Sequence, residues 1–253
     1  MTGDDHVLAR DLAGQAGQRL LELRAQRGDP DVLRKAGDRL SHEFLTAALA
    51  GQRPGDVVLS EEGADNPARL GARRVWIVDP LDGTREFGEP GRSDWAVHVA
   101  LWESDTSDLT AGAVALPAQD TVLSTLEPPP GPPGDEAPDR IRIVVSRSRP
   151  PGFVRNISGL IKAELVPLGS AGAKVAAVIC GEVDAYVHGG GFYEWDTAAP
   201  VAVARAAGLH ASRIDGSALA YNQPDLLMPD ILVCRPALAG ILLQAIREVI
   251  HAP

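Results

Sequence analysis

The chain has 253 residues, 45% of them hydrophobic and 23% charged, which is enough for one large globular domain or two modest ones. This composition excludes fibrous, collagenous and wholly disordered proteins. With 34 acidic and 24 basic residues the formal net charge is −10, which argues against a nucleic acid polymer as partner. No apolar run approaches the roughly 20 residues that span a bilayer, and the acidic start does not resemble a signal peptide. We therefore expect a cytoplasmic protein with no membrane partner.

The first half of the sequence predicts two helices followed by several strands. Apolar residues recur at helical spacing from Leu8 to Leu23, which predicts a helix over residues 6–26. A second apolar stripe predicts a helix that begins near Asp38 and ends around Gly51. Short apolar runs then predict strands at 57–59, 75–78, 95–101, 111–116 and 121–126, the last two as a hairpin. Helices followed by strands indicate an α+β half over residues 1–139.

The second half has a different pattern. A proline-rich stretch within residues 127–139 breaks all periodicity and predicts an extended connection. After it the chain alternates between strands, at 140–145, 164–167, 183–188 and 230–234, and helices, at 152–163, 171–181, 197–208 and 236–251. Residues 140–253 therefore form an α/β half. Cys180 and Cys234 follow apolar residues and have no CxxC partner, so we expect two buried thiols.

The strongest chemical signal follows the strand at 75–78, which runs into Asp79-Pro80-Leu81-Asp82-Gly83-Thr84. Two carboxylates leave the strand at its end, and Gly83-Thr84 can begin a helix whose free N–H groups face an anion. Carboxylates beside an anion site imply cations between them, and such oxygen ligands suit Mg²⁺. No His or Cys lies nearby in the sequence, which disfavours zinc. Taken alone, the motif is explained equally well by an Asp-Gly turn that closes a strand.

Two further acidic segments strengthen the metal-site interpretation. Ser60-Glu61-Glu62-Gly63 closes another apolar run, and Glu194-Trp195-Asp196-Thr197 precedes an Ala-rich segment that contains Pro200. Because proline is tolerated only in the first turn of a helix, we expect a helix that starts close to Asp196 or Thr197. This would place Asp196 at the N-terminus of the helix. The alternative is that Asp196 only caps that helix.

Together these segments resemble a known family. Glu61-Glu62, Asp79-Pro80-Leu81-Asp82-Gly83-Thr84 and Trp195-Asp196 are similar, in order and approximate spacing, to the signature of the Mg²⁺-dependent, lithium-sensitive phosphatases related to inositol monophosphatase. The resemblance covers nearly the whole chain apart from the proline-rich stretch. It implies a layered αβαβα sandwich with the site between its two halves, inhibition by Li⁺, and a homodimer, which is common in the family.

The resemblance also implies roles for individual residues. Two or three Mg²⁺ ions would be held by Glu61, Asp79, the Leu81 carbonyl, Asp82 and Asp196. Asp38 matches an Asp at the start of the family's second helix, although Gly37 stands where relatives often have another residue. Asp38 and Thr84 would act on the attacking water, which a metal ion held in part by Glu61 would activate. Backbone N–H groups of Gly83 and Thr84 would hold phosphate oxygens.

Within the family the sequence is most similar to the nucleotidases that remove the 3′-phosphate of adenosine 3′,5′-bisphosphate. The similar segments are Leu59-Ser60-Glu61-Glu62, Arg85-Glu86-Phe87 after the DxxDGT motif, Val145-Ser146-Arg147-Ser148, and Leu168-Gly169-Ser170 followed by Lys174. Inositol phosphatases usually have Asn where Glu86 stands, and an acidic sugar-binding residue seven positions before the WD Asp, where this chain has Gly189. The resemblance therefore implies a nucleotidase of sulfur metabolism, which could also act on the 5′-phosphosulfate analogue.

Candidate substrate contacts follow from the same resemblance. Arg147, Ser170 and Lys174 are candidates for the second phosphate or the nucleoside, and Tyr193 and Glu194 for the border of the base or sugar. Arg147 could instead belong to a solvated charge cluster, and Lys174 to a helix surface. His188, Trp95 and Trp102 are assigned to the strands or the core. The alternative substrates are inositol 1-phosphate, fructose 1,6-bisphosphate or a range of sugar phosphates. An inactive binding protein would not need every ligand position intact.

Overall fold

The computed structural model describes residues 2–26, 28–131, 137–148 and 150–250. The elements up to residue 131 are α1 (Thr2–Ala25), α2 (Pro30–Gln52), β1 (Val57–Ser60), the 3-10 helix η1 (Pro67–Gly71), β2 (Arg74–Asp82), α3 (Thr84–Gly88), β3 (Ala96–Glu103), β4 (Asp108–Leu116), η2 (Pro117–Gln119) and β5 (Thr121–Ser124). Those from residue 137 onward are β6 (Arg142–Ser146), α4 (Gly152–Ile161), β7 (Glu164–Leu168), α5 (Ala171–Ile179), β8 (Ala185–His188), β9 (Phe192–Tyr193), α6 (Glu194–Ala206), β10 (His210–Ser212), β11 (Leu227–Met228), β12 (Ile231–Cys234), η3 (Pro236–Leu238) and α7 (Ala239–Ile250).

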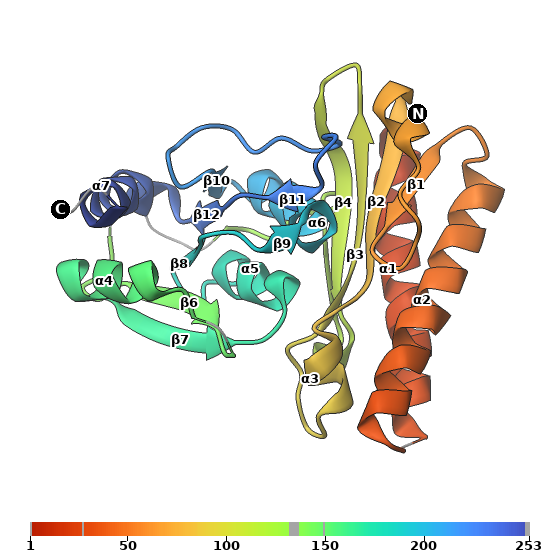
Figure 1. Ribbon diagram of the computed structural model, residues 1–253, viewed down its shortest axis with the longest axis horizontal. Coiled ribbons are helices and arrows are strands. Elements are labelled where there is room, and N and C mark those ends of the chain that lie inside the picture. Colours follow the sequence, from red (N-terminus) through yellow and green to blue (C-terminus); the bar gives the residue numbers. More distant parts are fainter. Residues whose placement is uncertain (1, 27, 132–136, 149, 251–253) are drawn as a thin grey trace.

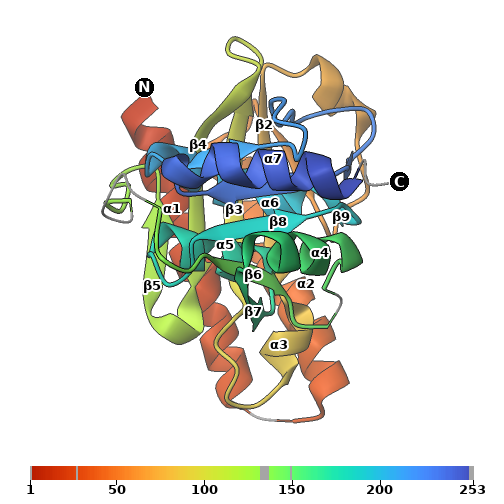
Figure 2. The same cartoon turned by 90° about the vertical axis from the view of Figure 1, so that its left-hand side faces the viewer.

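These elements stack in five layers, helix on sheet on helix on sheet on helix. In Figure 1 the layers follow one another from right to left: α1 with α2, the sheet β1–β5, α5 with α6, the second sheet, and α4 with α7. Figure 2 shows α4 and α7 lying over the second sheet. The predicted αβαβα sandwich is therefore confirmed.

Each of the two layered sheets has five strands among the described residues, and β9 and β11 form a separate two-stranded antiparallel sheet. The first has the order β1-β2-β3-β4-β5, with β1 parallel to β2 and the other neighbours antiparallel. The second has the order β10-β12-β8-β6-β7, with β6 parallel to both its neighbours and β12 antiparallel to both of its own. Residues 127–131 and 137–139 of the proline-rich connection contain no helix or strand, and residues 132–136 lie outside the described part. The division into halves at this connection stays a prediction.

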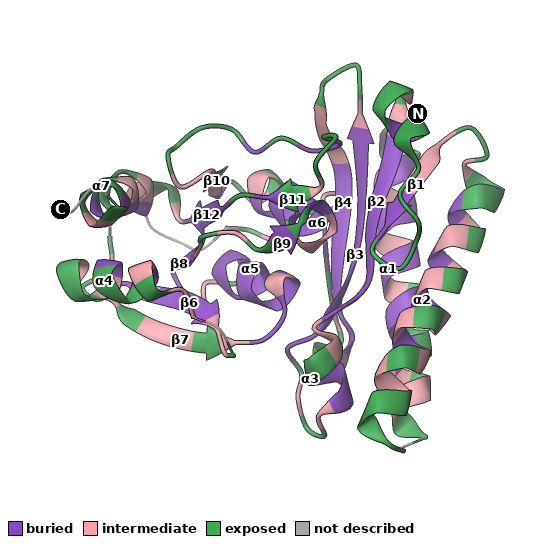
Figure 3. Ribbon diagram, in the orientation of Figure 1, coloured by how far each residue is buried: buried purple, intermediate pink, exposed green. Residues whose placement is uncertain are grey.

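Both faces of the first sheet are buried, because helices cover it on each side. Along β2, Trp76 and Val78 belong to the core beneath α1 and α2, while Val75 and Ile77 belong to the core shared with α5 and α6. This is why β2 is a continuous apolar run and not an alternating one. A third core lies between the second sheet and the pair α4 and α7. Figure 3 shows the resulting pattern, with strands β2 to β4 buried and much of α2 exposed.

One predicted helix start was wrong, and a second differs by two residues and keeps Asp196 in the first turn as predicted. α2 begins at Pro30, because the Asp29 side chain accepts hydrogen bonds from two N–H groups of the first turn and Pro30 suits the first helical position. Asp38 therefore lies in the interior of α2 and not at its start. α6 begins at Glu194, so Pro200 lies in the second turn of the helix. Since Pro200 has no N–H, the carbonyl of Asp196 loses the helical hydrogen bond it would otherwise accept.

Other differences are smaller. The helix predicted to begin at Gly83-Thr84 is present as α3, whereas the short elements η1, β9, β10 and β11 were not predicted from the sequence. Cys180 is exposed because it ends α5 at the surface, whereas Cys234 is buried in β12 as predicted. Trp95 and Trp102 lie in the core as predicted. None of the helices in the described ranges is long and apolar enough to cross a membrane.

The close approach of α6 to the first sheet gives a stability prediction. A Cβ atom at Gly112 in β4 would lie 2.8 Å from the Cβ of Ala202 in α6. We expect Gly112→Ala to lower the free energy of unfolding by about 1–3 kcal/mol through overpacking. Denaturant unfolding measures this change. Gly240→Ala in α7 is the control, because no atom lies within 4 Å of its new methyl group, and equal losses in both variants would contradict the prediction.

Candidate active site

Three carboxylates from two distant segments meet where the first sheet faces α5 and α6. Asp79 and Asp82 end β2 and Asp196 lies in the first turn of α6, and one oxygen of each lies within 4.8 Å of the others. Residues three apart in a regular strand point to opposite faces. Here the pairing of β2 with β3 shifts between Asp79 and Asp82, and this irregularity lets both carboxylates reach one site.

Asp82 is bound to the N-terminus of α5. Its carboxylate accepts the Ser170 hydroxyl at 2.5 Å and the N–H groups of Ala171 and Gly172 at 3.1 and 2.6 Å. These N–H groups have no partner inside the helix and carry the positive end of its dipole. Burial alone would raise the pKa of Asp82, but its interactions with His98, Lys174 and Ser170 outweigh burial and lower the pKa to about 2.

His98 lies beside the acidic cluster and was not singled out from the sequence. It is fully buried in β3, its Nδ1 donates to the Trp195 carbonyl at 3.1 Å, and its Nε2 lies 3.3 Å from an Asp82 oxygen. A Cβ atom at Gly172 would lie 2.1 Å from Nε2, so the ring is packed directly against the start of α5. A histidine thus lies beside the acidic cluster, contrary to the expectation drawn from the sequence. The only sequence signal was that His98 is a polar residue within the apolar strand that follows the acidic motif. Its pairing opposite Asp79 is a property of the folded sheet.

Thr84 links the acidic motif to α2. The motif is internally bonded, because the Leu81 N–H donates to Asp79 at 3.0 Å and the Leu81 carbonyl accepts the Thr84 hydroxyl at 3.0 Å. The Thr84 hydroxyl also lies 3.2 Å from a carboxylate oxygen of Asp38. Burial, and then the charge of Glu62, raise the pKa of Asp38 to about 6. The pairing of Asp38 with Thr84 expected from the family resemblance is therefore present in the structure, although Asp38 lies well inside its helix.

The cluster carries more negative charge than it can hold without cations. Burial and the neighbouring carboxylates raise the pKa of Asp79 well above its ordinary value. Burial and the charge of Asp196 raise the pKa of Glu61 to about 7, and burial and Asp82 raise the pKa of Asp196 to about 6. Such shifts arise when like charges share a buried site. Four carboxyl groups that cannot all ionise alone form an oxygen donor set that fits a hard divalent cation.

A cavity of about 470 Å³ opens beside the cluster. Asp82, Gly83 and Asp196 line one part of it, and Ser170 and Lys174 line its α5 side. Phe153, Tyr186, His188 and Phe192 supply aromatic surface to the rest, so His188 contributes to the cavity and not only to its strand.

Two residues of this region have fixed conformations. Gly83 has φ +83°, and a Cβ atom there would lie 3.0 Å from the Cβ of Ser170, so the position requires glycine. Lys174 is buried, and its Nζ donates to the carbonyls of Gly169 and Ser170. The alternative that Lys174 is a helix-surface residue is therefore wrong.

Three other candidate substrate contacts interact with residues of the protein outside the cavity. Arg147 pairs with Glu86 at 2.6 Å and with Glu89 at 3.0 Å. Glu194 is fully buried, and its two oxygens each accept a backbone N–H at 2.7 Å, from Asn222 and Gln223. Tyr193 is 45% exposed and stacks on Trp195, and its N–H donates to Asp196 at 2.6 Å. None of the three lines the cavity. Of the candidate substrate contacts, Gly83, Ser170 and Lys174 are thus the residues that do so.

Comparisons with known proteins agree with this geometry. The chain belongs to the inositol monophosphatase family, whose model matches residues 8–251. A relative from Mycobacterium leprae, named 3′-phosphoadenosine 5′-phosphate phosphatase, is 51% identical over 97% of this chain and 94% of its own length. The 3′(2′),5′-bisphosphate nucleotidase CysQ of Escherichia coli is 32% identical over 83% of this chain and 91% of its own length. The crystal structure of CysQ from Bacteroides thetaiotaomicron superposes with a TM-score of 0.78 at 30% identity, over 92% of this chain and 97% of that one.

The raised pKa values predict how stability depends on pH and metal. Without metal, Asp38, Glu61 and Asp196 have pKa values of about 6, 7 and 6, above the value near 4 of an unfolded chain. The folded state then binds more protons than the unfolded state between about pH 4 and 7, so these groups lower the free energy of unfolding as pH rises through that window. A divalent cation bound at the cluster would replace those protons.

We therefore expect Mg²⁺ to raise Tm by about 3 °C or more at about pH 7.5, and by less at about pH 5. Thermal unfolding in EDTA and in excess MgCl₂ measures both shifts. Asp196→Asn should reduce the shift at the higher pH, while Asp105→Asn, on an exposed residue, should not. A Mg²⁺ shift that is equal at both pH values would contradict the prediction.

Proposed function

We propose that this chain is a Mg²⁺-dependent phosphatase that removes the 3′-phosphate of 3′-phosphoadenosine 5′-phosphate (PAP). The main observation behind this proposal is that a single cavity is lined by the carboxylates Asp82 and Asp196, by aromatic side chains and by the buried Lys174. A nucleotide with two phosphates needs a site for the scissile phosphate, a site for the second phosphate and a surface for the base. The name of the Mycobacterium leprae relative supports the same substrate.

The donor set favours Mg²⁺. Glu61, Asp79, Asp82, Asp196 and the Leu81 carbonyl offer oxygen ligands, which is the chemistry that Mg²⁺ prefers in proteins. The chain carries a net charge of −10, so without cations the cluster would repel an anionic phosphate. Bound Mg²⁺ supplies positive charge that stabilises the leaving oxygen and acidifies water.

Thr84 and Asp38 orient the attacking water and accept its proton. The Thr84 hydroxyl has one proton and two acceptors within reach, the Leu81 carbonyl at 3.0 Å and Asp38 at 3.2 Å. When the proton turns to Asp38, the hydroxyl oxygen keeps a lone pair with which to accept a hydrogen bond from water. As the water oxygen bonds to phosphorus and the bond from phosphorus to the ribose oxygen breaks, the water proton passes through Thr84 to Asp38, and the departing ribose oxygen takes up a proton from solvent. Asp38 is only half-buried, so solvent can then remove that proton.

Gly83, Ser170 and Lys174, which line one cavity, are the proposed contacts of the substrate phosphates. The backbone at Gly83 faces the scissile phosphate, since the absence of a side chain at this position lets an anion approach closely. Lys174 uses Nζ to hold the turn at Gly169 and Ser170, and one of its three protons remains for a phosphate oxygen. Ser170 borders the same part of the cavity.

The Gly189 position favours a nucleoside over an inositol ring. A Cβ atom at Gly189 would lie 2.7 Å from the ring of Phe153. Phe153 therefore occupies the space that an acidic sugar-binding side chain at this position would take. An aromatic ring offers stacking to a planar base, and it offers no hydrogen-bond acceptor to the hydroxyl groups of inositol.

The test is phosphate release from PAP, inositol 1-phosphate and fructose 1,6-bisphosphate, compared as kcat/KM in one Mg²⁺ buffer. We expect a preference for PAP of about tenfold or more, which corresponds to ~1.4 kcal/mol in transition-state binding. A preference for inositol 1-phosphate would overturn the substrate assignment and leave the carboxylate chemistry in place.

A substitution at Phe153 separates base recognition from phosphate recognition. We expect Phe153→Ala to lower kcat/KM for PAP by about tenfold, because base stacking on an aromatic side chain contributes about 1–3 kcal/mol. Activity on p-nitrophenyl phosphate, which has no base, should change much less. Leu160→Ala is the control on the same helix, since Leu160 is exposed and does not line the cavity. Equal losses on both substrates would contradict a stacking role.

A substitution at Asp79 tests whether this residue is a metal ligand. Its carboxylate is buried among the other ligands, and Asp79→Asn removes its charge while it keeps the size of the side chain. We expect no measurable turnover, because the metal loses a charged ligand that no neighbour replaces. Phosphate release at saturating Mg²⁺ measures the effect, with Asp105→Asn as a variant of an exposed carboxylate. Activity retained within about threefold in Asp79→Asn would rule out this ligand assignment.

A further inference from the structure

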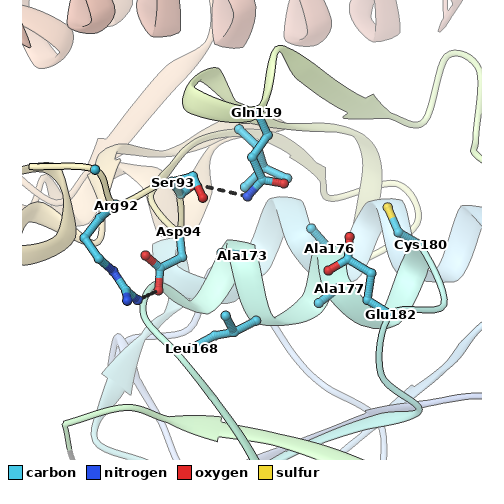
Figure 4. A pocket seen from close by; sticks show the side chains of 12 residues that line it. Arg92, Ser93, Asp94, Gln119, Leu168, Ala173, Ala176, Ala177, Cys180 and Glu182 are labelled. Carbon is cyan, nitrogen blue, oxygen red and sulfur yellow. Dashed lines mark hydrogen bonds and ion pairs between the residues drawn. The ribbon is translucent and has the colours of Figure 1, made fainter.

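A second cavity, of about 400 Å³, lies against a different face of α5 from the active-site cavity. Its floor is formed by the small side chains Ala173, Ala176 and Ala177. Figure 4 shows Asp94 and Arg92 in its wall, with their side chains pointing toward each other. We propose that Asp94, held by Arg92, is a positioning residue for the metal site, on which it acts through the turn at Gly169 and Ser170. This inference rests on the proposed function.

Asp94 contacts both the turn at Gly169 and Ser170 and the acidic motif at Gly83. It is buried, and its Oδ2 accepts the Gly169 N–H at 2.6 Å and a hydrogen bond from the Arg92 guanidinium. Its backbone carbonyl lies 3.2 Å from the place of a Cβ atom at Gly83. Asp94 therefore fixes the turn against the acidic motif from outside the active-site cavity, which it does not line.

The turn itself needs to be held. Ser170 has φ +43° and ψ 140°, a conformation that a residue with a Cβ atom rarely adopts. Lys174 holds it from the carbonyl side, with Nζ 3.2 Å from the Gly169 oxygen and 2.5 Å from the Ser170 oxygen. From the other side, the hydrogen bond that the Gly169 N–H donates to Asp94 holds the same turn in place.

The conformation of the turn sets the orientation of a proposed metal ligand. From this turn the Ser170 hydroxyl and the next two N–H groups all bind the carboxylate of Asp82. If the Asp94 bond is lost, Ser170 can relax to a common backbone conformation and move its hydroxyl away from Asp82. Groups that orient metal ligands in this way typically change metal affinity or activity by about 10–100-fold when they are removed.

The test compares Asp94→Ala, Asp94→Asn and Arg92→Ala with the wild-type protein. Asparagine keeps an acceptor oxygen for the Gly169 N–H, whereas alanine removes it. Asp105→Ala is the matched control, because Asp105 pairs with Arg73 at 2.6 Å on an exposed surface. The readouts are the dissociation constant of Mg²⁺ by titration calorimetry, kcat and KM for PAP, and Tm. Calorimetry is done below the thermal transition of each variant.

We expect Asp94→Ala to weaken Mg²⁺ binding and to lower kcat by about tenfold each, with KM for PAP changed by less than about threefold. Asp94→Asn should stay within about threefold of the wild type, and Arg92→Ala should lie between the two substitutions at Asp94. The Asp105→Ala control should behave as the wild type. A residue that only stabilises the fold would lower Tm and leave the Mg²⁺ affinity of the folded protein unchanged.

Two results would overturn the proposal: wild-type Mg²⁺ affinity in Asp94→Ala, or an Asp94→Asn variant as defective as Asp94→Ala. If Asp94→Ala does not fold, Arg92→Ala decides, since it keeps Asp94 and removes only its cation, and unchanged Mg²⁺ affinity there would overturn the proposal. A wild-type protein that binds Mg²⁺ but does not hydrolyse PAP would refute the proposed substrate. The Mg²⁺ affinities of the variants would then still decide the role of Asp94.

Discussion

The contact between Asp82 and the N-terminus of α5 is the constraint on which the rest of the site depends. Asp82 ends a strand of the first sheet, and α5 lies between the two sheets. Through Ser170, Ala171 and Gly172 this one carboxylate joins segments almost 90 residues apart in the chain. Because the bonds go to helix N–H groups that otherwise have no partner, the contact stabilises the helix end and fixes the carboxylate at once.

This contact also explains why the acidic residues differ in their protonation. Hydrogen-bond donors and cations lower the pKa of Asp82, whereas burial and neighbouring carboxylates raise the pKa values of Asp79, Glu61 and Asp196. The protein supplies fixed positive partners for one carboxylate and leaves the others to share protons or a divalent cation. A buried cluster of this kind is unfavourable for folding alone and becomes favourable when the cation is present.

Small residues make the close approaches possible. Gly172 leaves room for the His98 ring, Gly83 leaves room for Ser170, and Gly112 lets α6 lie directly on the first sheet. At each point a side chain would separate the elements that bring Asp82 and Asp196 together. The distances between carboxylates therefore depend on the packing of helices against the sheet as much as on the acidic motifs themselves.

The sequence by itself determined the longer elements and the local motifs, although the predicted start of α2 was wrong. The strand at β2, the helices of the second half and the acidic segments that follow apolar runs were all predictable, because periodicity and turn chemistry act over a few residues. The start of α2 follows from local sequence as well, since Asp29-Pro30 combines a capping side chain with a proline suited to the first helical position.

The tertiary structure alone decided which distant residues meet. His98 is one apolar-strand residue among many in the sequence, and its place beside Asp82 follows from the pairing of β3 with β2. In the same way, packing turned Arg147 toward Glu86, buried Glu194 against Asn222, and set Asp94 on the turn before α5. The physical reason is that a sequence pattern fixes which face of an element is apolar, whereas the partner of each polar group depends on how the layers stack.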